Sequence, residues 1–91
     1  MAFAVVGHVE WVEFVRVQRL AASGEIVHGK DSFEEPAGGG GVAAVQLARL
    51  AGEAHLFTAL GDDDLAQRAR ERLEELGVLV HSAVRDSPTR R

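Results

Sequence analysis

The second half of the chain alternates helix-forming and strand-forming segments, and this order restricts the fold more than any other feature. After a helical stretch over 42–50, the apolar run 54–60 predicts a buried strand. Apolar residues then recur at helical spacing over 65–76, and a third strand begins at Val78, with Val84 at its end. Strands joined by helices in this way pair in parallel through right-handed crossovers. The sequence therefore predicts an α/β domain with a mainly parallel sheet.

The N-terminal half predicts a β excursion before the first helix. The apolar run 2–6 is typical of a fully buried strand. Apolar and polar residues then alternate over 9–17, where β-branched and aromatic residues favour an extended strand. A further short strand is expected at 25–28, and the polar segment 29–37 is expected to form an exposed strand or loop. We therefore expect residues of about 9–37 to leave the main sheet.

Composition and charge exclude several classes of protein. The 91 residues make one small domain, 1–91, with an ordinary hydrophobic fraction of 46%. The net charge of −4 without a basic cluster argues against a nucleic-acid binder, and no apolar run reaches the ~18 residues of a membrane span. The absence of cysteine excludes a disulfide scaffold, and we expect a cytoplasmic protein. Arg68, Arg70 and Arg72 are interleaved with glutamates, which predicts a solvated helix face.

Four consecutive glycines, Gly38–Gly41, stand directly before the first helix. Glycine is costly at a helix start unless the backbone must turn or must let another group approach closely. The unpaired N–H groups of a helix start suit an anionic or polyhydroxylated ligand, and a flexible loop is the alternative. A P-loop is excluded because Val42 and Ala43 follow the glycines where Lys and Ser or Thr are required. A dinucleotide fingerprint ending at Ala43 lacks the buried strand that should precede it.

The remaining polar candidates indicate structural roles. No pair of the four histidines has a metal-binding spacing, so we expect no metal site, although His8 lies where it could contact a substrate. Trp11 is expected to pack in the core, with a lid or dimer contact as the alternative. The acidic run Asp62–Asp64 is explained by helix capping. The segment 87–89 has no partner base, so nucleophilic catalysis is not expected there.

Short motifs along the whole chain resemble, in their order, the N-terminal third of ribokinase or PfkB-type carbohydrate kinases. They are Gly7 after the first strand, Gly24-Glu25, the Gly38–Gly41 helix start, Ala48-Arg49-Leu50, Gly61-Asp62-Asp63 and Leu76-Gly77-Val78. The resemblance implies a ribokinase-like three-layer α/β/α fold with a small β-lid, truncated at its C-terminus. The excursion 9–37 would be that lid, and a homodimer through the lid strands is a further expectation.

The resemblance also implies a substrate site. In the family the glycines lie under the bound sugar, which points to Gly38, Gly39, Gly40 and Gly41 as substrate-binding residues. Glu10 stands where the family often has Asn and could contact a sugar hydroxyl. Three positions depart from the family pattern: Ala43 replaces an Asn, Gly40 a Lys and Val12 an Asp. These departures leave the substrate open.

The activity implied for the complete enzyme is phosphorylation of a hydroxymethyl group of a sugar or nucleoside by ATP, with Mg²⁺ on the nucleotide. The family's catalytic Asp and ATP site lie beyond these residues, so we expect no catalytic residue here and no activity from this chain alone. Two alternatives remain. One is a small non-enzymatic α/β module that binds a ligand, and the other is a dinucleotide-binding half-domain.

Overall fold

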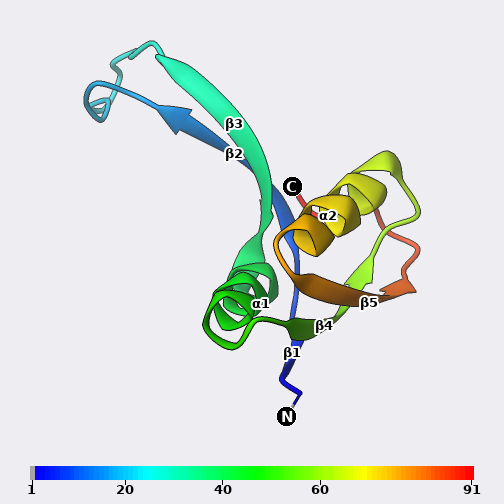
Figure 1. Cartoon of the computed structure of the whole chain (residues 1–91). Helices are drawn as coiled ribbons and strands as arrows, with labels where there is room; N and C mark the ends of the chain where they lie inside the picture. Colours follow the sequence, from blue (N-terminus) through cyan, green and yellow to red (C-terminus); the bar gives the residue numbers. More distant parts are fainter. Residues whose placement is uncertain (1) are drawn as a thin grey trace.

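The computed structural model describes residues 2–91, which form two β-sheets and two helices (Figure 1). In chain order the elements are β1 (Ala4–Val6), β2 (Glu10–Arg16), β3 (Asp31–Ala37), α1 (Gly38–Ala51), β4 (Ala54–Leu60), α2 (Asp64–Glu75) and β5 (Val78–Val84). Strands β1, β4 and β5 make a parallel sheet in that spatial order, while β2 and β3 pair antiparallel as a separate ribbon. The predicted α/β arrangement with a mainly parallel sheet is therefore confirmed.

Both helices of the described residues cover the same face of the parallel sheet. The chain crosses from β1 to β4 through α1 and from β4 to β5 through α2, always in the same direction, and right-handed crossovers then place both helices on one side. Successive residues of β4 accordingly differ in exposure: Leu56 is 0% exposed and Phe57 is 44% exposed. On β5, Val80 is buried while Leu79 is exposed. Residues 2–91 thus supply the sheet and one helical layer.

Small residues bring α1 close to the sheet, and capping groups define α2. Ala44 and Ala48 of α1 are buried in the same cluster as Leu73 of α2. The side chain of Asp63 accepts a hydrogen bond from the amide of Ala66 at 2.9 Å, so the predicted capping role is confirmed for this residue. Gly77 follows the helix with φ of +91°, as expected of a residue that ends a helix. Neither helix of residues 2–91 is long and apolar enough to cross a membrane.

The β2–β3 ribbon projects away from the rest of the molecule (Figure 1). Its register runs from Glu10 opposite Ala37 to Arg16 opposite Asp31, and the two strands pair outside the main sheet. The prediction of a strand at 25–28 is wrong. Glu25 instead accepts hydrogen bonds from the amide of Ala22 and from Arg19, and these bonds close a turn at the tip of the ribbon.

Three further expectations need correction. The run 2–6 is not a fully buried strand: β1 covers 4–6 only, and Val6 is 85% exposed because one sheet face is open. The first helix begins at Gly38 and so includes the glycines. The arginines of α2 are only partly solvated, because Arg70 donates to the carbonyl oxygen of Val80 and the half-exposed Arg68 and Arg72 contact the ribbon. Met1 lies outside the described residues.

Candidate functional site

A hollow of about 430 Å³ opens where the carboxyl ends of β1 and β4 meet. Ligands of parallel α/β sheets bind outside this edge, because the strand ends and the following loops converge there. The hollow is lined by Val6, Gly7, His8, Val9, Phe57, Thr58, Ala59, Arg85 and Arg90. Glu10 and Gly38–Gly41, the predicted substrate-binding residues, do not line it, but His8, which contacts them, does.

The glycine run lies against the chain that leaves β1. The amides of Gly40 and Gly41 donate to the carbonyl oxygen of His8 at 2.9 and 3.3 Å, and the amide of Gly39 donates to His8 Nε2 at 3.3 Å. A Cβ on Gly40 would lie 2.6 Å from the carbonyl carbon of Gly7, closer than two such atoms can pack. The glycines are thus the first turn of α1, and the flexible-loop alternative is wrong. Three of their N–H groups already have partners within the chain.

Glu10 lies beside the same helix start. Its Oε1 is 3.7 Å from Nε2 of His8, and both side chains are about half exposed. Gly38 has φ of +78°, and a Cβ there would lie 2.9 Å from the Glu10 amide nitrogen. The structure therefore brings Glu10, His8 and Gly38–Gly41 together. Val12 is two residues along β2 from Glu10 and shares its face of the ribbon, while Ala43 is exposed on α1.

Two arginines that sequence reasoning did not select also line the hollow. Arg90 reaches it because its carbonyl oxygen accepts a hydrogen bond from the amide of Trp11 at 2.7 Å. Arg85 donates to the carbonyl oxygen of Pro88 at 2.6 Å, and its Nε is buried without a partner among residues 2–91. No sequence signal could have placed Arg90 beside β2, because the two segments are about eighty residues apart and meet only in the fold.

The C-terminal segment is held in place by Asp63. The amide and hydroxyl of Thr89 donate to the Asp63 carboxylate at 2.8 and 2.6 Å, and the amide of Gly61 donates to the Thr89 hydroxyl at 3.0 Å. These hydrogen bonds from Thr89, followed by that from the Ala66 amide, hold the pKa of Asp63 below its usual range. Thr89 is 4% exposed and serves here as an anchor for the segment that carries Arg90.

Residues 2–91 offer no ready site for the phosphates of a nucleotide or for its metal ion. Three N–H groups at the start of α1, which could hold a phosphate, already donate to His8, and Glu10 adds negative charge nearby. No group of three or more His, Asp or Glu that could hold a metal ion occurs within residues 2–91. The dinucleotide fingerprint is also out of place, because β3 before it belongs to the antiparallel ribbon and not to the parallel sheet.

Solved structures share this architecture over almost the whole chain. Arabidopsis thaliana ribokinase, solved with ribose and ATP, is 29% identical with a TM-score of 0.66, and the match covers 98% of this chain and 30% of that one. A putative ribokinase from Agrobacterium tumefaciens is 23% identical with a TM-score of 0.83, over 97% and 29% of the two chains. Escherichia coli phosphofructokinase-2, solved with fructose-6-phosphate, is 18% identical with a TM-score of 0.81, over 98% and 29%.

The chain thus spans about 30% of the length of the solved structures that it matches. No curated protein sequence matches it significantly. The family model described as pfkB family carbohydrate kinase matches residues 2–91. That match takes in the parallel sheet, the ribbon and the glycine helix start together, and the chain belongs to the pfkB family of carbohydrate kinases.

Proposed function

We propose that this chain supplies the sugar-facing part of a kinase that phosphorylates a hydroxyl group of a sugar or nucleoside at the expense of ATP. The observation that carries the proposal is the meeting of Glu10, His8 and Gly38–Gly41 beside the hollow at the carboxyl edge of the sheet. The ribokinase of Arabidopsis, solved with ribose and ATP, supports this choice of reaction. A cytoplasmic location is part of the same proposal.

The residues of the chain would bind and orient the acceptor. The Glu10 carboxylate would accept hydrogen bonds from sugar hydroxyls, and charged acceptors make the stronger bonds of this kind. The glycines would act mainly by lacking side chains, because three of their amides already donate to His8. A sugar ring could then approach the backbone at the exposed Gly39. The β2–β3 ribbon would cover the acceptor and exclude water.

The two arginines favour an acceptor that already carries a negative group. Arg85 and Arg90 line the hollow, and guanidinium groups bind phosphate oxygens in pairs. The phosphofructokinase-2 structure, solved with fructose-6-phosphate, is a precedent for a sugar phosphate on this fold. A sugar phosphate is therefore the acceptor that we would test first.

The experiment is a coupled kinase assay on the complete protein with a panel of sugars, nucleosides and sugar phosphates. Replacement Glu10→Gln should weaken acceptor binding about tenfold, which corresponds to ~1.4 kcal/mol. Arg90→Gln should remove the preference for a phosphorylated acceptor over its neutral parent. The matched control is Glu53→Gln, which changes an exposed carboxylate outside the hollow. Unchanged acceptor affinity in the Glu10 variant would contradict the site.

Residues 1–91 alone are expected to show no turnover. Sugar-dependent ATP consumption by the isolated chain would overturn that expectation. Binding of the acceptor by the complete protein without any turnover would instead favour the non-enzymatic binding module.

A homodimer through the ribbon also remains a proposal, supported by the exposure of Phe14, Val15 and Phe33. Sedimentation of the complete protein would test it.

A further inference from the structure

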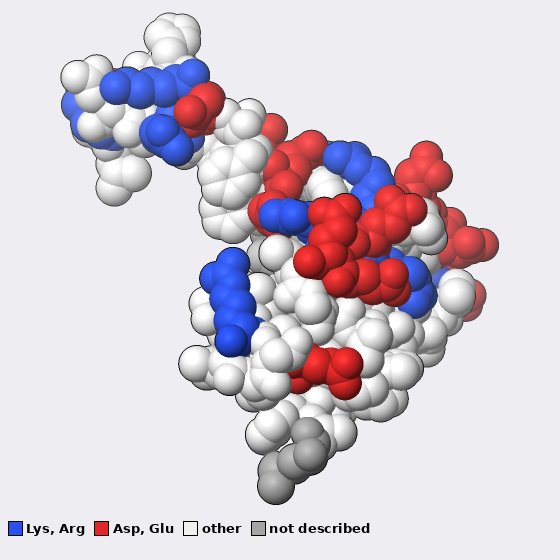
Figure 2. Space-filling model, in the orientation of Figure 1, with Lys and Arg blue, Asp and Glu red and all other residues white. Residues whose placement is uncertain are grey.

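Two neighbouring glutamates on β3 face two arginines on α2. Side chains of consecutive strand residues point to opposite faces, so Glu34 and Glu35 lie on the two sides of the ribbon. Arg68 and Arg72 are four residues apart, and they therefore share one side of their helix. The two pairs meet where the ribbon leaves the body of the molecule, and acidic and basic groups gather in this region in Figure 2.

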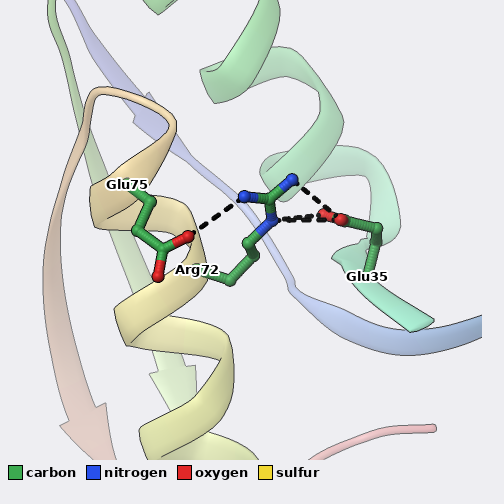
Figure 3. A network of polar contacts seen from close by, with 3 residues as sticks. All are labelled: Glu35, Arg72 and Glu75. Atoms are coloured by element: carbon green, nitrogen blue, oxygen red, sulfur yellow. Dashed lines mark hydrogen bonds and ion pairs between the residues drawn. The ribbon is translucent and has the colours of Figure 1, made fainter. Parts of the chain in front are cut away.

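The guanidinium of Arg72 lies between Glu35 of the ribbon and Glu75 of its own helix (Figure 3). Its Nε donates to both Glu35 carboxylate oxygens at 3.0 Å, and a terminal nitrogen lies 3.0 Å from Oε1. Glu75 accepts from the remaining terminal nitrogen at 3.1 Å and so orients the guanidinium from its own helix. The hydrogen bonds to Glu35, followed by that to Glu75, raise the pKa of Arg72. The guanidinium thus contacts Glu35 through two of its nitrogens and Glu75 through the third, which a compact ammonium group cannot reproduce.

Arg68 contacts the other face of the ribbon, where its guanidinium lies over the ring of Trp11. Its guanidinium lies 4.5 Å from the centre of the Trp11 ring, and one of its nitrogens is 3.6 Å from Oε2 of Glu34. The Trp11 indole donates to the other Glu34 oxygen at 3.0 Å, and Trp11 is only 6% exposed. Glu13 stands directly opposite Glu34, and like charges in that position repel. Arg68 supplies the positive charge that offsets this repulsion.

The ribbon therefore has two parts with different surroundings. Its root, residues 10–13 and 34–37, is tied to α2 by the contacts above. Its outer part, residues 14–33, makes its hydrogen bonds and ion pairs only within itself, as far as the described residues show. Figure 1 shows this outer part extending away from both helices. A cross-strand stack of Phe14 on Phe33, with ring centres 5.0 Å apart, begins the outer part.

We propose that Arg68 and Arg72 are positioning residues that fix the root of the ribbon on α2, so that movement is confined to residues 14–33. The ribbon then bends at the Phe14–Phe33 stack, while its base keeps a fixed orientation on α2. The link to acceptor binding rests on the proposed function, whereas the anchoring itself does not. Loss of both arginines would release the whole ribbon and misplace Glu10, which belongs to the root.

Pulsed EPR on the full chain tests the anchoring directly. Spin labels would be attached through Gln18→Cys at the tip and Leu50→Cys at the end of α1, both exposed, and the 91 residues contain no other cysteine. The double replacement Arg68→Gln with Arg72→Gln should broaden the distance distribution at least about twofold. The charge exchange Arg72→Glu with Glu35→Arg keeps an ion pair between ribbon and helix, so its distance distribution should be nearly as narrow as that of the wild type. Arg49→Gln, an exposed arginine of α1, is the matched control and should leave the width unchanged.

Each result decides the proposal. An unchanged distribution in the double variant, with its circular dichroism spectrum intact, overturns it. If the double variant fails to fold, Arg72→Lys gives the answer, because lysine keeps the charge but cannot contact Glu35 and Glu75 through three nitrogens and should broaden the distribution part of the way. Unchanged width in that variant also overturns the proposal. In the complete protein, the KM for the acceptor should rise about tenfold in the double variant, ~1.4 kcal/mol, with a smaller change in kcat. An EPR effect without measurable kinase activity would refute the proposed function and leave the anchoring intact.

Discussion

The parallel sheet and the β2–β3 ribbon are stabilised by different means within one chain. The sheet depends on buried aliphatic residues, since Leu56, Leu73 and Val78 are almost fully enclosed. The ribbon has a half-exposed aromatic stack and depends on ionic and indole contacts at its root. A two-stranded ribbon is only marginally stable alone, so contacts at one end decide where it stands. The sheet is therefore stabilised by burial of apolar side chains, whereas the position of the ribbon depends on contacts at its root.

The largest expected effect comes from the core of the sheet. Leu56→Ala should lower the free energy of unfolding by about 2–5 kcal/mol, because a fully buried side chain leaves a cavity. Urea unfolding measures this change. Leu79→Ala, at a 41% exposed position on the open face, is the control and should cost less than about 1 kcal/mol. Equal losses from both replacements would mean that the open face is as well packed as the covered one.

Two alanine replacements in the glycine run at the start of α1 should change the stability of the protein in opposite directions. Gly40→Ala should destabilise the protein by about 1–3 kcal/mol, since its Cβ would press on the backbone of Gly7. Gly41→Ala should stabilise it by roughly 0.5–1 kcal/mol, because the nearest atoms would be 3.9 Å away and alanine favours the helix. Thermal unfolding of the two variants distinguishes them. The same sign for both would refute the close contact.

Within the ribbon we expect a local effect. Phe33→Ala removes the stack on Phe14, worth about 0.5–1.5 kcal/mol, and should speed hydrogen exchange at residues 14–33. Exchange in β4 and β5 should stay as it is, because neither ring belongs to the core cluster. Faster exchange throughout the sheet would show that ribbon and sheet unfold as one unit and would erase the distinction between them.

The smallest expected effect concerns the anchor of the C-terminal segment. Because the folded-state pKa of Asp63 lies below the ordinary value of 3.8, its contribution to stability is present above that value and is lost as the pH falls through the lower, folded pKa. Asp63→Asn should therefore flatten the acid side of the stability profile, measured by thermal unfolding between about pH 2 and 6. Asp62→Asn is the neighbouring control. Identical acid profiles for wild type and Asp63→Asn would contradict the anchor.

The sequence was sufficient for the elements that bury a repeating apolar pattern. Strand 54–60 and the helix that begins after Asp63 follow from such patterns, and the family resemblance carried by the glycines and the Gly61-Asp62-Asp63 turn is confirmed. The strand expected at 25–28 failed because its polar and apolar residues have no partner strand across the tip. Local propensity cannot show whether a partner is present.

The candidate site was predictable only where its residues are close to a recognisable motif. Glu10 and the glycines were selected through the family pattern, and the structure brings them together, whereas their binding role stays a prediction. Arg68 and Arg72 were assigned to a solvated face because interleaved charges usually indicate one. Their partners, Glu34 and Glu35, are more than thirty residues away, and only the fold places them across from α2. Contacts between distant segments leave no periodic signal in a single chain.

The contact between Gly7 and Gly40 also limits which residues the two positions can tolerate. Each backbone occupies the space that a side chain on the other would need, so the two positions share a single steric restriction. A saturation library of this protein should show intolerance at both, although they are thirty-three residues apart. Recovery from a substitution at either one should then require movement of the whole start of α1 relative to the segment that leaves β1.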